Sequence, residues 1–336
     1  MIPITHVPVT EVAKRIFRVG PLETGHTSAP TSPYIIVGKD RTLIAEPGQD
    51  GQVTGIIEAL GVLDVPVNKV EYVWASHIHL YHIQGLSVLM PEVPKAKFLA
   101  HPRGAPHIIE PTRLMESTRG IWNVEETPEE RGTKCYAPYR AIPAVKVQTV
   151  QDNEIIDLGG KKLQVIWAPG HAPHHMGLFD LESHALFAGD MGHRPGPGRV
   201  RARHDIRPPL FELDLFVQTA QRFLDLKPSV YLGFSEGGAG HEPEQTLRWE
   251  IDDMVAIEKI CREGMQQKVS FAEIGRRVDA YELSVFGIPR PARGTASVAE
   301  GGGQRMLVGM LAFVKRKHPE LQMPADASPR SAMVGA

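Results

Sequence analysis

Three histidines fall within six residues in the stretch Ser76-His77-Ile78-His79-Leu80-Tyr81-His82. The stretch follows a predicted strand at residues 72–75. Side chains alternate along an extended chain, so His77 and His79 share one side, and a helix starting near His82 would turn that imidazole back toward them. Imidazoles gathered in this way at a strand end are typical of a metal site.

Two later stretches carry groups of the same kind. A predicted strand at 163–167 leads into Ala168-Pro169-Gly170-His171-Ala172-Pro173-His174-His175. Asp190 follows the apolar run 186–189, where no hydrophobic role explains a carboxylate. A lone histidine is more often a hydrogen-bonded core residue, but the three elements together, in this order, favour a metal site.

The surrounding sequence predicts short strands separated by turns, at residues 16–19, 34–37, 42–45, 72–75, 97–100 and 163–167. A helix is predicted over 52–60, and apolar residues recur at helical spacing through 215–224, 247–261 and 306–314. This mixture predicts an α/β or layered α+β fold whose last third is mostly helical.

Composition narrows the class of protein. With 336 residues, 42% of them hydrophobic and 23% charged, the chain is neither disordered nor collagen-like. A net charge of -2 argues against nucleic-acid or membrane binding driven by bulk charge. Cys135 and Cys261 are too few for a disulfide scaffold. Since neither a signal-like N-terminus nor a bilayer-length apolar run is seen, we expect a cytoplasmic protein.

The three stretches resemble the motifs of the metallo-β-lactamase-fold superfamily: H-x-H-x-D-H, then a G-H step, then a G-D step. The resemblance covers residues 16–238 and extends to a metallo-hydrolase branch with C-terminal helices. It implies an αββα sandwich at residues 1–240, then a helical extension packed on the core at residues 241–336, with a frayed tail from about residue 324.

The resemblance also implies a role for each matching residue. His77, His79 and His171 correspond to the three-histidine first metal site, and Asp190 corresponds to the carboxylate that bridges two metals. Zn²⁺, one per chain, is the expected cofactor, with iron or manganese as the other options.

The second metal site departs from the family pattern. Tyr81 stands where the family has an aspartate, and Phe234 or Ser235 stands where it has its final histidine. Only His82 and Asp190 remain there, and two ligands hold a transition metal poorly. We therefore expect one metal, unless Tyr81 as a phenolate, Glu236 or His241 supplies a substitute ligand. Tyr81 could instead pack over the vacated site, bonded to Asp190 or His82, or serve as an acid, base or substrate clamp.

Four more residues are candidates near the site. His174 and His175 follow His171 closely, and we expect them to support the ligands or the fold. His193 and Arg194 follow Asp190 and are candidates to face the substrate.

A three-histidine metal with an open position lowers the pKa of a bound water to about 7 and so supplies hydroxide at neutral pH. The leading hypothesis is a mononuclear hydrolase of a small ester, lactone, thioester or related electrophile, with Asp190, Tyr81 and His82 as catalytic residues. The alternatives are a non-hydrolytic iron or manganese enzyme, such as a lyase or oxygenase, and a binding protein that has lost turnover. We expect a small-molecule substrate and neither nucleic acid nor membrane as a partner, and a homodimer stays open.

Overall fold

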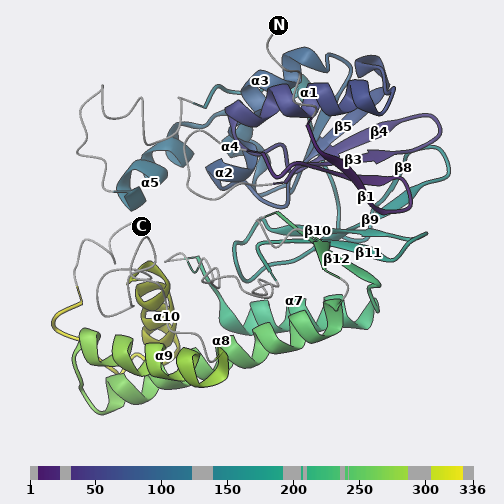
Figure 1. Ribbon diagram of the computed structural model, residues 1–336. Coiled ribbons are helices and arrows are strands. Elements are labelled where there is room, and N and C mark those ends of the chain that lie inside the picture. The colour runs from purple at the N-terminus through teal and green to yellow at the C-terminus, as the bar shows by residue number, and fades with distance from the viewer. Residues whose placement is uncertain are drawn as a thin grey trace, which may run out of the picture. The chain divides into compact units, whose positions relative to one another are not determined.

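Two β-sheets lie face to face in the first of two compact units (Figure 1). The structure is a computed structural model that describes residues 7–22, 32–122, 139–191, 206, 210–234, 239–240, 242–286 and 304–327. The first unit contains the described residues up to 168 with 174–189 and 226–243, and the second contains 169–173, 190–225 and those from 244 onward.

The first sheet has seven strands in the order β1 (Val9–Ala13), β2 (Ile16–Val19), β3 (Tyr34–Val37), β4 (Thr42–Ala45), β5 (Val70–Trp74), β6 (Lys97–Ala100) and β7 (Val147–Thr149). Strands β1 to β4 form an antiparallel meander, whereas β4 to β7 run parallel. The carboxyl ends of β4, β5 and β6 therefore meet at one edge, which is where parallel sheets place their functional loops.

The second sheet has six strands in the order β13 (Ala239–Gly240), β12 (Val230–Gly233), β11 (Ala185–Gly189), β10 (Met176–Asp180), β9 (Lys162–Trp167) and β8 (Ile155–Asp157). Its pairs are antiparallel except for β11 with β12. The chain leaves β9 and returns on β10 through the stretch that contains His171, and it leaves β11 at Asp190.

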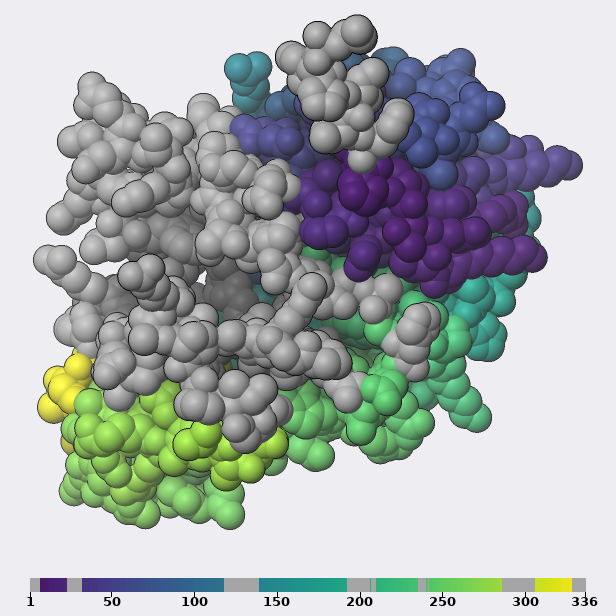
Figure 2. Space-filling view, viewed as in Figure 1, coloured from purple at the N-terminus to yellow at the C-terminus, as the bar shows by residue number. Residues whose placement is uncertain are grey.

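Alternation along the strands of the first sheet divides its side chains between two cores. Leu43 and Ala45 of β4 face the second sheet, and Ile44 between them joins the core on the other side. Every residue of β4 is buried, because the strand is covered on both faces. Edge strand β1 is only partly buried, and Figure 2 shows the purple side chains of β1 and β2 at the surface.

Helices cover the outer face of the first sheet (Figure 1). The helices whose side chains fill this core are α1 (Val53–Val62), α2 (Leu80–Ile83), α3 (Leu86–Glu92) and α4 (Ala105–Ile109). The same part of the chain contains α5 (Thr112–Trp122) and the short 3-10 helices η1 (Asp50–Gln52), η2 (Val67–Lys69) and η3 (Ala144–Lys146). The apolar residues of α1 that face the sheet, Ile56 and Leu60, are four apart and fully buried.

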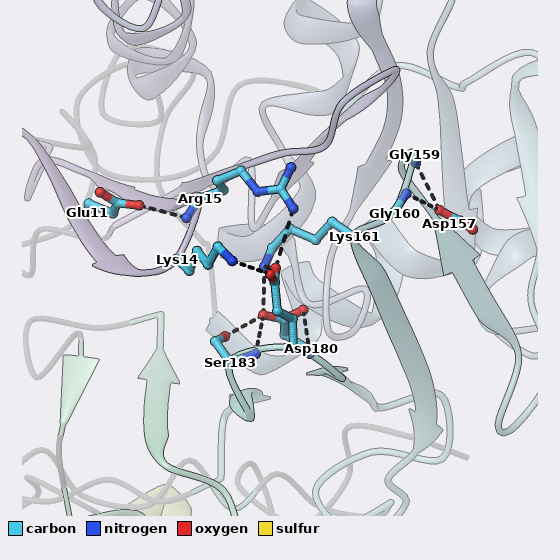
Figure 3. A network of polar contacts seen from close by, with 10 residues as sticks. Glu11, Lys14, Arg15, Asp157, Gly159, Gly160, Lys161, Asp180 and Ser183 are labelled. Carbon is cyan, nitrogen blue, oxygen red and sulfur yellow. Dashed lines mark hydrogen bonds and ion pairs between the residues drawn. The ribbon is translucent and has the colours of Figure 1, made fainter.

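A buried ion pair joins the residue directly before β9 to the last residue of β10 in the second sheet (Figure 3). Lys161 Nζ lies 2.7 Å from Asp180 Oδ2, and both side chains are fully buried. Glu182 extends the pair to Lys14 and Arg15 of the β1–β2 turn. The bond donated by Lys14 is the main cause that lowers the pKa of Glu182 to about 2. The network therefore links the β1–β2 hairpin of the first sheet to the β10–β11 turn of the second sheet.

The second unit is helical, with α7 (Leu213–Asp225), α8 (Pro243–Gln266), α9 (Phe271–Phe286) and α10 (Gln304–Lys317). Leu247, Met254 and Ile257 of α8 are buried on one stripe, as the helical spacing predicts. Asp326 accepts a bond from the backbone N–H of Phe271 at the start of α9, at 2.7 Å. Among the described helices, none is both long enough and apolar enough to cross a membrane.

The expected fold class is confirmed: two sheets with covering helices and a helical C-terminal region. The predicted strands at 16–19, 34–37, 42–45 and 97–100 have the same bounds in the structure. The helix expected near His82 begins at Leu80 instead, because the backbone of His79 is still extended and the helical turn starts directly after it.

Candidate metal centre

The loop that leaves β5 carries the first two histidines. His77 Nε2 lies 2.6 Å from His79 Nδ1, and the two rings stand nearly perpendicular at 81°. Ser76 Oγ lies 3.0 Å from His77 Nδ1, so the serine fixes the ring nitrogen that does not face His79. Two imidazole nitrogens directed at one point are arranged to bind one ion.

His171 and Asp190 supply the other two donors. His171 lies in the connection between β9 and β10, and its Nε2 is 3.5 Å from Asp190 Oδ2. The ligand atoms of His77, His79, His171 and Asp190 all lie within 4.8 Å of one another. Within the described ranges this is the one group of histidine, cysteine or acidic side chains close enough to share an ion.

The donor set fits a divalent transition metal. Three imidazoles and one carboxylate are the ligands that Zn²⁺ and its first-row neighbours prefer. Gly189 directly precedes Asp190 with φ of +58°, and an added Cβ there would meet Ser76 Cβ at 2.5 Å. The glycine thus lets the end of β11 approach the loop of His77 more closely than any side chain allows.

Aromatic rings surround His82, the residue that the family pattern assigns to a second metal. The ring of Phe234 stacks on the His82 imidazole with centroids 4.2 Å apart and an angle of 29°. The ring of Tyr81 lies 4.4 Å from that of His82 and 6.2 Å from that of Phe234. Phe234, one of the two residues that stand where the pattern has its final histidine, therefore lies directly beside His82.

Glu46 is a buried residue of this site whose role the sequence interpretation missed. Its Oε2 lies 2.6 Å from His82 Nδ1, and its Oε1 accepts a bond from the backbone N–H of Ser76 at 3.1 Å. It is 2% exposed and sits at φ of +56° directly after β4. The signal was available: like Asp190, Glu46 is a carboxylate at the end of an apolar strand.

His174 and His175 lie beside the ligands. The ring of His174 is stacked with that of His77 at 6.3 Å, and the ring of His175 lies 5.1 Å from it. His175 Nδ1 donates to the carbonyl of Ala168 at 3.1 Å, which fixes its tautomer. Both rings thus pack against that of His77, and the supporting role expected for the two residues stays a prediction.

His101, directly after β6, is a further buried histidine. Its Nδ1 accepts the backbone N–H of Arg103 at 3.0 Å, and its ring lies 4.5 Å from that of Trp167. Burial, with a smaller contribution from the charge of Arg103, lowers the pKa of His101 to about 4. The imidazole is therefore neutral at physiological pH.

Four candidates lie outside the described residues: His193, Arg194, Glu236 and His241. Their assignments as substrate contacts or substitute ligands stay predictions. The catalytic roles of Asp190, Tyr81 and His82 also stay predictions, although the structure brings Asp190 to the ligand group and packs Tyr81 against His82.

Comparison with known proteins agrees with this geometry. The family described as the metallo-beta-lactamase superfamily matches residues 27–235. The matched range contains all four ligands of the group as well as Glu46, Tyr81, His82 and Phe234.

Individual relatives are similar over most of the chain. The metallo-beta-lactamase fold-containing protein ST1585 of Sulfurisphaera tokodaii is 28% identical over 250 residues, covering 73% of this chain and 81% of that protein. Its crystal structure aligns with a TM-score of 0.56 at 24% identity, over 72% of this chain and 86% of that one. The metallo-beta-lactamase family protein TTHA1429 of Thermus thermophilus aligns with a TM-score of 0.58 at 18% identity, over 87% of this chain and 91% of that one. At these identities the structural likeness concerns the fold.

Proposed function

Because this chain belongs to the metallo-beta-lactamase superfamily, we propose that it is a metal-dependent hydrolase with one ion held by His77, His79, His171 and Asp190. The observation that carries the proposal is the convergence of the four ligand atoms to within 4.8 Å of one another. We take zinc as the ion and the cytoplasm as the compartment.

A divalent ion held by this group would lower the pKa of a coordinated water to about 7 and would polarise the oxygen of the bond to be cleaved. The protein's part is to hold and orient. Ser76 fixes the ring of His77, and the half-buried His79 is the most exposed of the four ligands. Asp190 is 7% exposed. One oxygen of its carboxylate would bind the ion, and we assign to the other oxygen the orientation of the attacking water and acceptance of its proton.

The surroundings of His82 support a single ion. Phe234 stacks on this imidazole, and a phenyl ring offers no lone pair to a metal. Glu46 engages the Nδ1 of the same ring. In this proposal His82 packs beside the metal site as a buried residue and does not act as a ligand to a second metal.

The substrate class follows from what one ion can do. With one ion, the leaving group has no second metal to stabilise it, so the best substrates carry good leaving groups. Esters, lactones and thioesters of small molecules meet this condition. Tyr81, whose ring lies 5.9 Å from that of the ligand His79, is the residue that we assign to substrate contact.

A substrate screen tests the hydrolase proposal. Purified protein loaded with Zn²⁺ is assayed against small aryl esters, lactones and acyl thioesters, beside His79→Ala and a matched His107→Ala on α4. We expect turnover of at least one class by wild type and His107→Ala, and its loss in His79→Ala. Equal rates in all three proteins, or no hydrolysis of any class by a fully loaded wild type, would contradict the proposal.

A further inference from the structure

The turn that carries His171 is anchored on the start of α7. The backbone N–H of Glu212 donates to the carbonyl of Gly170 at 2.9 Å, and Thr219 Oγ1 donates to the carbonyl of Pro169 at 2.7 Å. Thr219 is 4% exposed, so its bond is sheltered from water. The two residues directly before the ligand are thus held by two separate bonds.

Gly170 allows the turn that carries His171 to lie against the backbone of α7. It adopts φ of +130°, and an added Cβ would meet both the backbone nitrogen and Cα of Phe216 at 2.3 Å. Backbone atoms of a helix cannot yield as a flexible side chain can. A small displacement of the start of α7 therefore moves the backbone next to His171.

Helix α10 in turn holds the start of α7. Arg316 Nη2 donates to the carbonyl of Phe211 at 2.6 Å and to Glu212 Oε1 at 2.9 Å. The same two elements are also in apolar contact, because the ring of Phe313 on α10 packs edge-on against the ring of Phe211, with centroids 6.2 Å apart. Because Phe211 and Glu212 are adjacent, the guanidinium fixes the peptide whose N–H holds Gly170.

From these contacts we propose that Arg316 is a positioning residue for the metal: it sets the affinity of the site by fixing the backbone that orients His171. The inference rests on the proposed metal site and adds a role for the C-terminal helices, of which no side chain belongs to the ligand group. Binding energy is sensitive to such support, since loss of groups that orient a ligand typically lowers metal affinity about 10–100-fold.

The chain offers a matched control on the same helix. Lys317, next to Arg316, forms an exposed ion pair with Asp214 in the first turn of α7. Its charge acts on Glu212 from a distance, and its hydrogen bond goes to Asp214, whereas that of Arg316 goes to the Phe211 carbonyl. Lys317→Ala removes the same charge from the same helix and keeps both hydrogen bonds that Arg316 donates to Phe211 and Glu212. Comparing the two variants thus separates the effect of losing a positive charge on α10 from the effect of losing the Arg316 hydrogen bonds that fix the backbone beside His171.

The test is titration of the metal-free full chain with Co²⁺, followed by the visible d–d absorption and by competition with a chelator. We expect Arg316→Ala to weaken Co²⁺ binding about tenfold, Arg316→Lys to recover part of it through its remaining donor, and Lys317→Ala to match wild type. Urea unfolding of each metal-free protein shows whether the variants are folded. Thr219→Val, which removes the second anchor with little change of shape, serves if Arg316→Ala does not fold, and weakening is expected there too.

Two results would overturn the inference. Wild-type affinity and spectrum in Arg316→Ala, or in Thr219→Val if that variant is used, would show that the anchor does not control the site. Equal weakening of Co²⁺ binding in Arg316→Ala and Lys317→Ala would show that the loss of a positive charge, and not the loss of the backbone anchor, lowers the affinity. A wild-type protein that binds no Co²⁺ would instead defeat the metal site itself, and with it the proposed function.

Discussion

Glu46 Oε2 lies 2.6 Å from His82 Nδ1, and both side chains are buried. Glu46 also accepts the backbone N–H of Ser76, so one carboxylate ties α2 to the loop of the first two metal ligands. Removing a buried carboxylate that accepts two hydrogen bonds lowers the stability of the folded protein. Each donor that loses its partner stays buried, away from water, and its desolvation is no longer compensated.

Glu46→Gln replaces one of the two acceptor oxygens by an amide nitrogen, which can only donate. We expect a loss of about 1–3 kcal/mol in the free energy of unfolding. Urea unfolding of the metal-free protein measures it, with the exposed Glu58→Gln of α1 as the control. A variant as stable as the control would show that the two bonds contribute nothing.

Restoring the family pattern should restore a second metal. Tyr81→Asp with Phe234→His returns an acidic and an imidazole ligand to the side of His82 that Phe234 now covers. We expect about two ions per chain in the double variant and about one in wild type and in Tyr81→Asp alone. Elemental analysis measures the ratio. Two ions in wild type would mean that Tyr81, Glu236 or His241 already completes the second site.

The buried pair of Lys161 and Asp180 predicts a large effect on stability. Lys161→Met leaves Asp180 charged and buried without its cation, and breaking a buried pair in this way costs about 3–5 kcal/mol. The neighbouring Lys162 is exposed, so Lys162→Met is the matched control and should change the free energy of unfolding by less than about 0.5 kcal/mol. Similar values for the two variants would contradict the structure of the network.

His101 predicts a loss of stability in mild acid. Its pKa falls from 6.5 to about 4 on folding, so between these values the unfolded chain binds a proton that the folded chain does not. The stability contributed by the neutral imidazole is fully present above pH 6.5 and is lost as the pH falls toward 4. His101→Asn keeps an acceptor for the Arg103 N–H but cannot titrate. We expect its urea midpoint to fall less than that of wild type across this range, and parallel curves would refute the assignment.

Most of the elements near the site were predictable from sequence, because local pattern determines them. The strands at 34–37 and 42–45 are apolar runs between turn residues, and His77, His79 and Asp190 stand at strand ends where only polar function explains them. Strand β10, in contrast, was not predicted, although all five of its residues are buried. Its sequence Met176–Asp180 contains a glycine and ends in an aspartate, two residue types that are depleted in strands, so the local pattern is weak.

Long-range contacts explain what the sequence did not reveal. Nothing near Glu46 in the chain indicates His82, which lies 36 residues away. The burial of His101 likewise depends on Trp167, a residue of the other sheet. The anchor of Gly170 on Phe216 requires a close backbone approach that no periodicity announces. These are tertiary relationships, and they decide which histidines can bind a metal.

The proposed single-ion site is tested most directly by the metal content of protein purified without a metal-affinity column, measured by inductively coupled plasma mass spectrometry on wild type, His79→Ala and His107→Ala. We expect about one zinc per chain in wild type and His107→Ala and well under one in His79→Ala, since His79 is one of four converging ligands. Well under one metal per chain in wild type, or a full complement in His79→Ala, would rule out the proposed site.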